Sequence, residues 1–300
     1  MFFGGEINEH LAAIRSAAEK LKVDLELISF SRVLFDTADG EVLIQGESSD
    51  GAPARKADEF DVVFFRMAGK YWEEIALLTD SLRRAGARVV DPATRAGNPF
   101  ANRKAHQMLA LSSAGLPVPR SIYGSLPWLC EEAKHGLFPF PLILKGSAGH
   151  GGANVYKMDR LEDLNTLAKR LWPGEAKEGR KYMLQEFIEN DGDYRLLVLG
   201  DKVLGTAKLR RAAHGDFPNS YAVDGSMEAA LLPEAAHGLA VQAARVCGLA
   251  FAAVDVVFRE DDMNKPSILE VSGSPSFEGF AQVLGIDVPA ELVKFLSTLG

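Results

Sequence analysis

The chain contains little of what marks a secreted or zinc-binding protein. Its 300 residues include only two cysteines, Cys130 and Cys247, which lie far apart and without the spacing of metal ligands. A disulfide framework is therefore not expected, and a reducing compartment is the default. The six histidines are scattered, with no His-x-x-x-His pair. No zinc site is predicted from them.

Long apolar runs and an excess of positive charge are also missing. No run approaches the roughly 20 apolar residues that span a bilayer, and the first residues, Met1–Glu6, are too short and glycine-rich for a signal sequence. We therefore expect a cytoplasmic protein with no membrane partner. The formal net charge of −8 argues against a nucleic-acid partner, because binding a phosphate backbone needs a basic face.

The patterning that is present predicts a mixed α/β protein of two or three subdomains, since the chain exceeds the usual size of a single core. Expected helices cover 8–21, 72–84, 161–171, 234–247, 277–283 and 288–299, besides one that begins near Lys104. Expected strands cover 23–28, 60–65, 88–90, 140–145, 153–157, 182–188, 251–258 and 267–275, with hairpins at 32–44 and 194–209. In the first third, strands alternate with helices, which favours an open and mostly parallel sheet. Asp91-Pro92 and Gly97-Asn-Pro99 mark a boundary after it.

Two carboxylates near the end of the chain form its most informative pair. Asp255 lies in the apolar segment 251–258, Glu270 lies in 267–275, and Lys265-Pro266 breaks the chain between them. Two neighbouring strands can therefore aim both acids at one point. Hard oxygen ligands suit Mg²⁺. The pair predicts a magnesium site, and upstream lysines with a glycine-rich turn extend the prediction to Mg-ATP.

That glycine-rich turn joins two of the expected strands. It reads Gly146-Ser-Ala-Gly149-His-Gly151-Gly152 and directly follows Lys145. Glycines let backbone N–H groups approach an anion without obstruction by a Cβ atom. The pattern is neither a P-loop nor a dinucleotide fingerprint, because no Gly-Lys-Ser/Thr and no helix follow it directly. A plain hairpin turn and a solvated lysine at a strand end are the alternatives to a phosphate-binding loop.

Three further segments each have a binding interpretation and a plain structural one. Lys104, taken alone, is most simply a surface lysine at the start of a helix. The backbone of Gln185–Ile188 can pair with adenine while a following acid binds ribose, or it is simply a strand and a turn. Arg210 and Arg211 end a strand. Such a pair usually faces water, but either residue can hold a phosphate or a substrate carboxylate bidentately.

The order of these motifs resembles that of an ATP-grasp ligase, most closely the RimK-type α-L-glutamate ligases and then the glutathione synthetases. The resemblance covers about two thirds of the chain, from near residue 100 to the end. It rests on Lys104, Leu116–Pro119, Lys145–Gly152, Gln185–Ile188, Asp193–Arg195, Arg210–Phe217, Ala253–Asp255, Leu269–Pro275 and Glu278-Gly279. It implies an open α/β pre-ATP-grasp domain at 1–100, a small central subdomain with the glycine-rich lid at 101–182, and a C-terminal catalytic subdomain at 183–300.

The resemblance also implies roles for individual residues. Those expected to contact ATP are Lys104, Lys145, Gly149, Gly151, Gly152, Glu186, Phe187, Ile188, Asp193 and Asn219. Asp255 and Glu270 would bind Mg²⁺, or Mn²⁺ in its place, with Glu270 bridging two ions and Ser272 in the position of a further ligand. Arg210 and Arg211 would assist the reaction electrostatically. Arg195 and Arg211 could hold the carboxylate of an amino-acid substrate.

One departure from the family pattern affects the metal site. The family motif reads Glu-Val-Asn, whereas this chain has Glu270-Val-Ser272. Asparagine offers a carbonyl oxygen that reaches a second Mg²⁺, and the serine hydroxyl is a shorter and weaker ligand. Changing a group that supports a metal often costs roughly 10–100-fold in affinity or activity. Ser276 also stands where the family has glycine.

Three functions therefore remain open at the level of sequence. The first is an ATP- and Mg²⁺-dependent ligase that joins a carboxylate to an amine, such as an amino acid or peptide, through an acyl-phosphate. The second, motivated by Ser272, is a nucleotide-binding protein without ligase chemistry that acts as a sensor or partner subunit. The third is a small-molecule kinase on the same scaffold. Members of the family commonly associate, so the resemblance also implies a homo-oligomer.

Overall fold

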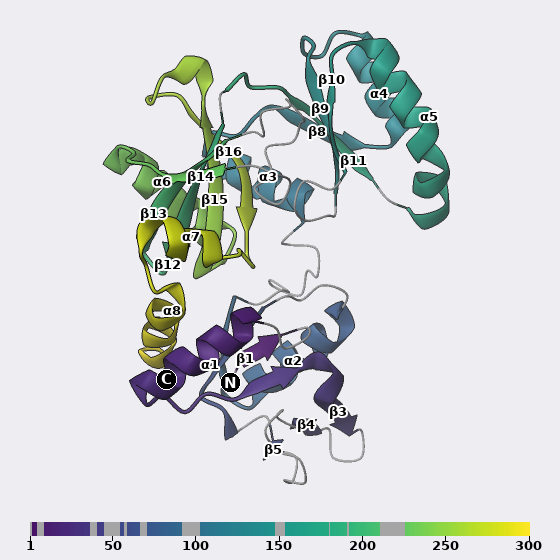
Figure 1. Ribbon diagram of the computed structural model, residues 1–300. Helices are drawn as coiled ribbons and strands as arrows, with labels where there is room; N and C mark the ends of the chain where they lie inside the picture. Colours follow the sequence, from purple (N-terminus) through teal and green to yellow (C-terminus); the bar gives the residue numbers. More distant parts are fainter. Residues whose placement is uncertain are drawn as a thin grey trace.

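The computed structural model describes residues 2–4, 9–36, 41–44, 55–56, 59–66, 71–91, 103–147, 154–179, 181–190, 192–210 and 226–300. These residues form three layered units, with the first domain at the bottom of Figure 1, the C-terminal sheet at the upper left and the small central unit at the upper right. The helix α3 (Lys104–Ser113) lies between the two upper units. No helix among these residues is long and apolar enough to cross a membrane.

The first domain is built on a four-stranded parallel sheet in the order β2-β1-β6-β7. Its elements are β1 (Phe2–Gly4), α1 (Glu9–Leu21), β2 (Leu27–Ser29), β6 (Val62–Phe65), α2 (Trp72–Arg84) and β7 (Arg88–Val90). A separate antiparallel sheet joins β3 (Val33–Asp36), β4 (Glu41–Ile44) and β5 (Arg55–Lys56). The predicted parallel sheet and hairpin are confirmed. The strand predicted at 23–28 is wrong over its first four residues, because β2 begins only at Leu27.

The central unit is a four-stranded sheet in the order β10-β9-β11-β8, with α4 and α5 packed against each other beside it (Figure 1). Its elements are β8 (Ser121–Gly124), α4 (Leu126–Lys134), β9 (Leu142–Gly146), β10 (Val155–Met158), α5 (Leu161–Glu178) and β11 (Tyr182–Glu186). The sequence interpretation did not include β8 or α4, and α5 continues past the predicted end at 171. Strand β11 pairs with β8 and β9. The predicted boundary at 182 therefore falls at the start of a strand that belongs to this sheet.

The C-terminal unit is a five-stranded antiparallel sheet in the order β14-β13-β12-β15-β16. Its elements are β12 (Asp193–Leu199), β13 (Lys202–Arg210), β14 (Ser226–Ala229), α6 (Glu234–Val246), β15 (Phe251–Phe258), η3 (Arg259–Asp261), β16 (Pro266–Ser272), α7 (Glu278–Leu284) and α8 (Val288–Ser297). Most of these match the predicted segments to within about two residues, as boundary fraying allows. Strand β14 was not predicted.

Strand alternation divides the β12 side chains between the two faces of this sheet. Leu196 and Val198 pack under α6 and α3, whereas Leu197 and Leu199 join the core shared with the first domain. On that second face, the apolar positions lie at one end of the sheet. At the other end the same face carries Asp193 and Arg195, and this charged end is where the candidate site forms.

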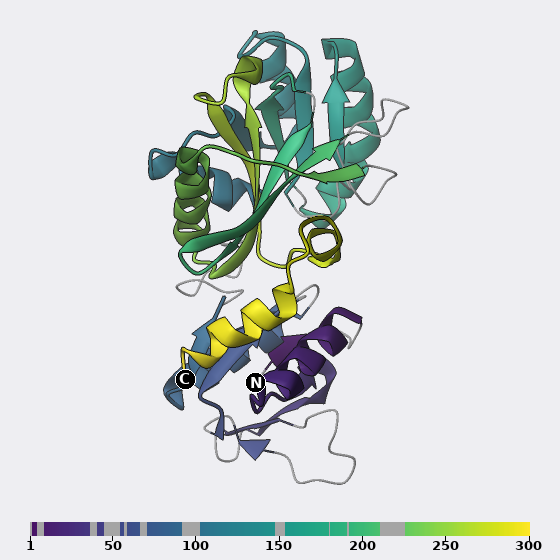
Figure 2. The ribbon, with the colours of Figure 1, turned by 60° about the vertical axis from the view of Figure 1, so that its left-hand side comes forward.

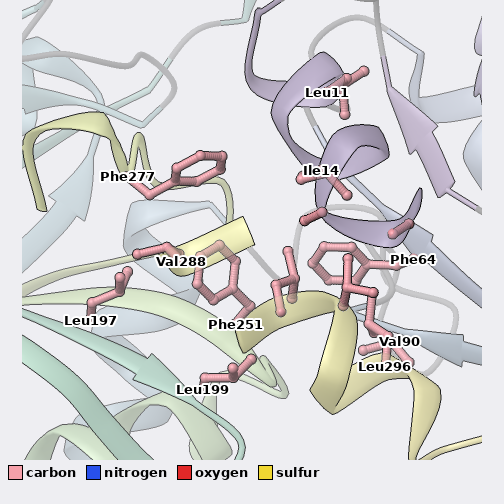
Figure 3. Packing of buried hydrophobic residues seen from close by; sticks show 14 of the residues in the cluster. Leu11, Ile14, Phe64, Val90, Leu197, Leu199, Phe251, Phe277, Val288 and Leu296 are labelled. Atoms are coloured by element: carbon pink, nitrogen blue, oxygen red, sulfur yellow. The ribbon is translucent and has the colours of Figure 1, made fainter. Parts of the chain in front are cut away.

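A single apolar cluster joins the first domain to the C-terminal sheet. Figure 3 shows Leu11, Ile14 and Phe64 of the first domain close to Phe251 of β15 and Leu296 of α8. In Figure 2 the helix α8 lies along the first domain, beside α1. Burial of apolar area stabilises this contact by about 25 cal/mol per Å². The charged end of the C-terminal sheet is therefore held in a fixed position relative to the strand ends of the first domain.

Among the glycines that the structure describes, Gly192, which precedes Asp193, is the one whose replacement should be most costly. Its φ is +146°, and a Cβ atom there would lie 2.4 Å from the backbone oxygen of Leu209. We expect Gly192→Ala to destabilise the protein by about 1–3 kcal/mol. The new Cβ atom would clash with the Leu209 backbone, and alanine rarely adopts this φ angle. Chemical denaturation measures this change in the free energy of unfolding.

Gly238→Ala is the matched control, since Gly238 lies within α6 and a Cβ atom added there would have no atom within 4 Å. That change should stabilise by about 0.5–1 kcal/mol, and equal effects of the two changes would refute the strain argument.

Candidate active site

The two acids singled out in the sequence lie directly opposite each other. Asp255 of β15 pairs with Glu270 of β16. The next pair in register is Val256 with Ile268, so Leu269 is an extra residue that forms a bulge beside the acids. Bulges re-aim side chains and occur often next to active sites. The predicted convergence of the two strands is thus realised, with an irregularity at the position of the acids.

Each acid is held by a basic side chain from a different element. Arg195 of β12 donates from Nε and Nη2 to the two carboxylate oxygens of Asp255, at 2.7 Å each. The attraction of Asp255 raises the pKa of Arg195 further, against the effect of burial. Lys104 donates from Nζ to Oε1 of Glu270 at 2.5 Å. Bidentate and charge-assisted contacts of this kind are the strongest hydrogen bonds in proteins. Four groups far apart in the sequence therefore form one charged cluster.

The position of Lys104 is set by the docking of α3 on β16. Gln107, one helical turn further on, is buried and donates from Nε2 to the Val271 carbonyl at 2.8 Å. Beyond the other end of α3, the Ile268 N–H of β16 donates to the Pro117 carbonyl at 2.8 Å. These bonds fix the first turn of α3 over Glu270. They explain why a lysine that is unremarkable in the sequence reaches an acid 166 positions away.

Lys145 brings the central sheet into the same cluster. It lies in β9 and is paired across the sheet with Met183 and Val155. Burial and the neighbouring charge of Lys104 together lower its pKa to about 8, against the attraction of Glu270, Asp193 and Asp255. These mutual effects place Lys145 within electrostatic range of both acids and of Asp193. Burial and repulsion by Lys104 disfavour the charged form of Lys145. A phosphate chain placed beside the two lysines would offset this repulsion.

The acids supply the oxygen donors that Mg²⁺ prefers. Ser272 is two residues after Glu270 on β16 and is paired with Ala253. It therefore shares the face of Glu270 and Asp255 and is only partly buried. Within the described part of the chain, no group of three or more His, Cys, Asp or Glu residues lies together as a metal site. The donor set that fits a metal here is thus two carboxylates with a serine hydroxyl, which suits a hard cation that keeps several waters.

Residues 186–188, which were expected to contact adenine, lie where the chain passes from β11 of the central unit to β12 of the C-terminal unit. The Glu186 N–H donates to the Arg120 carbonyl at 3.0 Å, so this backbone donor already has a protein partner. The Ile188 carbonyl accepts from Nδ2 of Asn190 at 2.7 Å. Lys157 of β10 lies over the Phe187 ring, 4.6 Å from its centroid. The sequence interpretation gave no role to Lys157, since a lone lysine on a strand carries no signal of its own.

The Glu186 side chain also ties two units together, which sequence reasoning did not foresee. Its carboxylate accepts from the Arg120 N–H at 2.8 Å and from the Arg259 guanidinium of η3. Burial alone would raise the pKa of Glu186, but these hydrogen bonds hold it below its ordinary value. Asp193, expected near the ribose, lies at the start of β12. The charge of Asp193 acts on Lys145 and Arg195 of the cluster, whereas Glu186 contacts Arg120 and Arg259.

The structure separates Arg210 from this cluster. Because Asp193 is paired with Leu209, the next residue, Arg210, points to the opposite face of the sheet. Its Nε donates to Oε1 of Glu228 at 2.8 Å, and both side chains are about half exposed. The expectation that Arg210 assists at the acids does not fit this placement. The predicted site residues Arg211 and Asn219 lie outside the described residues, as do the lid glycines Gly149, Gly151 and Gly152 and with them the predicted closure of the lid.

Comparison with known proteins decides the family. The model of the RimK-like ATP-grasp domain matches residues 101–296. The chain belongs to the RimK-like ATP-grasp family. A similar curated protein, the "probable alpha-L-glutamate ligase" of Xanthomonas axonopodis pv. citri (strain 306), is 34% identical over 195 residues. That match covers 64% of this chain and 63% of the relative. A protein of the same name from Xanthomonas euvesicatoria pv. vesicatoria is 30% identical over 79% of this chain and 78% of its own length.

Solved ATP-grasp structures share the whole fold. The ATP-grasp ligase PsnB, complexed with a minimal precursor, matches with a TM-score of 0.71 at 21% identity, over 99% of this chain and 97% of that one. The D-cycloserine synthetase DcsG matches with the same TM-score of 0.71 at 13% identity, over 100% and 99% of the two chains. The matched ATP-grasp domain contains every described member of the charged cluster. The first domain, for which the family model gives no match, is covered by the structural similarity.

Proposed function

We propose that this protein is an ATP- and Mg²⁺-dependent ligase that joins a carboxylate to an amine and forms an amide or peptide bond. The observation that carries the proposal is the charged cluster of Lys104, Lys145, Arg195, Asp255 and Glu270, assembled from the central and C-terminal sheets. It combines cations for a phosphate chain with oxygen donors for a metal. The names of the curated relatives support glutamate as an added amino acid.

The chemistry follows from what these side chains can hold. An oxygen of the substrate carboxylate attacks the γ-phosphorus of ATP in line, and ADP leaves with the electron pair of the broken P–O bond. The amine then attacks the carbonyl carbon of the acyl-phosphate, loses a proton, and expels inorganic phosphate. Lys104 and Lys145 are suited to hold phosphate oxygens, and Arg195 keeps Asp255 oriented. Mg²⁺ or Mn²⁺, when bound, would be held by Asp255 and Glu270 and would offset phosphate charge.

No protein nucleophile is required by this scheme, and positioning plus electrostatics carry it. The acids are neutralised by Arg195 and Lys104 in the protein alone. Lys104 would be attracted to the phosphates, which frees Glu270 oxygens for the metal, while the Asp255 oxygens have further lone pairs beside the contact with Arg195. The expected substrates are thus ATP, one carboxylate and one amine, the latter an amino acid or peptide.

The direct test is release of ADP by the purified protein with Mg²⁺ and a panel of amino acids and peptides. The proposal predicts release that needs both a carboxylate and an amine, together with a product whose mass equals their sum less one water. Binding of ATP with no release across the panel would instead favour a nucleotide-binding protein without ligase activity. A stable phosphorylated product would favour a small-molecule kinase.

Ser272 is the specific observation behind the nucleotide-binding alternative, and its replacement tests whether it takes part in metal binding. If Ser272 supports a weak second metal site, Ser272→Asn should strengthen Mg²⁺ activation roughly 10-fold or more, and Ser272→Ala should weaken it, since such groups are worth about 10–100-fold. The measurement is the Mg²⁺ concentration for half-maximal ADP release. If both variants keep the wild-type Mg²⁺ dependence, Ser272 has no part in metal binding.

A further inference from the structure

Arg66 is a buried cation that the proposed chemistry does not use. It directly follows β6, at the end of the parallel sheet of the first domain, and is only 3% exposed. Its Nη2 donates to the Pro275 carbonyl at 2.8 Å. Its guanidinium lies 5.2 Å from the ring centroid of Phe251 and 5.7 Å from that of Phe277. Both rings are visible in Figure 3, on the side of the C-terminal unit that meets the first domain.

Among the described residues, the guanidinium has no acid hydrogen-bonded to it, although the charge of Asp91 lies near enough to act on its pKa. Of its nitrogens, Nε and Nη1 are buried and have no hydrogen-bond partner. Asp91 is the neighbouring acid, but its carboxylate accepts from the N–H groups of Ala250 and Phe251 instead. No carboxylate of the described residues forms an ion pair with Arg66, and burial lowers its pKa to about 10. A buried guanidinium with unused N–H donors is costly. Arg195, by contrast, donates from two nitrogens to Asp255.

The position of Arg66 relates it to the charged cluster. Phe251, beneath its guanidinium, and Asp255 lie on the same face of β15, four residues apart, which corresponds to about 13–14 Å along a strand. Between them lies Ala253, and opposite Ala253 lies Ser272, both small. Pro275, which binds Arg66, follows Ser272 by three residues. Ala253 is buried and Ser272 is only partly buried, so a ligand of amino-acid or short-peptide length would approach the guanidinium from the Ser272 side.

We propose that Arg66 is a carboxylate-binding residue for the amino-acid or peptide substrate, with its free Nε and Nη1 receiving a carboxylate that does not react. This inference rests on the proposed ligase function. Planar guanidinium groups recognise carboxylates through paired N–H donors, and a lysine cannot reproduce that geometry. The first domain would thereby contribute to substrate selection, whereas the residues for ATP and metal come from the other two units.

The test uses the full chain and L-glutamate as the probe, titrated calorimetrically in the presence of Mg²⁺ and a non-hydrolysable ATP analogue. Arg66→Lys should weaken L-glutamate binding at least about 10-fold, since it keeps the charge but loses the fork. Affinity for the ATP analogue should stay at the wild-type value. Arg83→Lys, on the exposed face of α2, is the matched control and should leave both affinities unchanged. Unchanged L-glutamate binding in Arg66→Lys, or an equal loss for the nucleotide, would overturn the assignment.

A second measurement does not depend on a folded variant. A crystal structure of the wild-type protein with L-glutamate and the ATP analogue should place a carboxylate oxygen within about 3.2 Å of Nε or Nη1 of Arg66. Water or protein groups on both nitrogens would overturn the proposal. If ADP release is observed but Arg66→Lys behaves as wild type, only this inference fails. If L-glutamate occupies Arg66 and no substrate supports ADP release, the ligase function fails while the carboxylate site stands.

Discussion

Changing Glu270 to glutamine should abolish most of the Mg²⁺-dependent release of ADP, by roughly 100-fold or more. The physical reason is that Glu270 stands at the centre of the charged cluster. It is paired with Asp255 across β15 and β16 and accepts from Lys104 at 2.5 Å. A neutral amide is a poorer ligand for a hard cation and no longer balances the lysine. The measurement is steady-state ADP release over a range of Mg²⁺ concentrations.

The control for this change is Glu291→Gln. Glu291 is also paired with lysines, Lys202 and Lys294, but lies on α8 away from the acids. Its loss should leave ADP release within about twofold of wild type, because exposed ion pairs contribute little. Folding of both variants is checked by thermal unfolding. Wild-type ADP release in a folded Glu270→Gln protein would exclude Glu270 as a metal ligand.

Replacing Lys145 by methionine should lower turnover roughly 100–1,000-fold, the usual loss when one preorganised electrostatic contact is removed. Lys145 is partly buried on β9 within range of Lys104, Glu270 and Asp193. Methionine keeps the length and apolar stem of the side chain but has no charge. Lys134→Met, on the exposed side of α4, is the control and should retain wild-type turnover. Turnover unchanged in Lys145→Met would reject the role of Lys145.

The pH dependence of nucleotide binding tests the same residue independently. Burial lowers the pKa of Lys145 to about 8, so its positive charge is present below that pH and is lost as pH rises through it. ATP affinity of the wild-type protein should therefore fall above about pH 8, and this fall should be absent in Lys145→Met. The free energy of unfolding changes in the opposite direction. Between about pH 8 and 10.5 the lysine is protonated in the unfolded chain but not in the folded protein, so the free energy of unfolding rises with pH over this range.

The convergence of the two acids could be predicted from sequence because it depends on local signals. The apolar run around Asp255, the alternation around Glu270 and the Lys265-Pro266 break specify two adjacent strands. The bulge at Leu269 has no such signal, because it arises from how β15 and β16 pair. Helix α2 and strand β7 were predicted at their observed bounds, since both are bounded by turn residues. Residues 23–26 alternate like a strand but pair with no strand among the residues that the structure describes.

Contacts that depend on tertiary placement were beyond the sequence. Lys104 reads as a surface lysine until the bond from Gln107 to Val271 fixes α3 on β16. Arg210 is the last residue of β13, and because its neighbour Leu209 is on the face of the acids, Arg210 faces away from them. Arg66 carries no motif, and its burial against Pro275 appears only when the first domain packs on the C-terminal unit. The order of motifs indicated the family, while the packing shows which side chains meet.

In the proposed reaction, the carboxylate is activated by phosphorylation before the amine attacks it. The most direct measurement supplies a carboxylate substrate labelled with ¹⁸O in both oxygens and follows the label by mass spectrometry. A ligase that forms an acyl-phosphate must transfer one ¹⁸O to the inorganic phosphate and keep the other in the amide product. Release of unlabelled phosphate would contradict the proposed ligase chemistry.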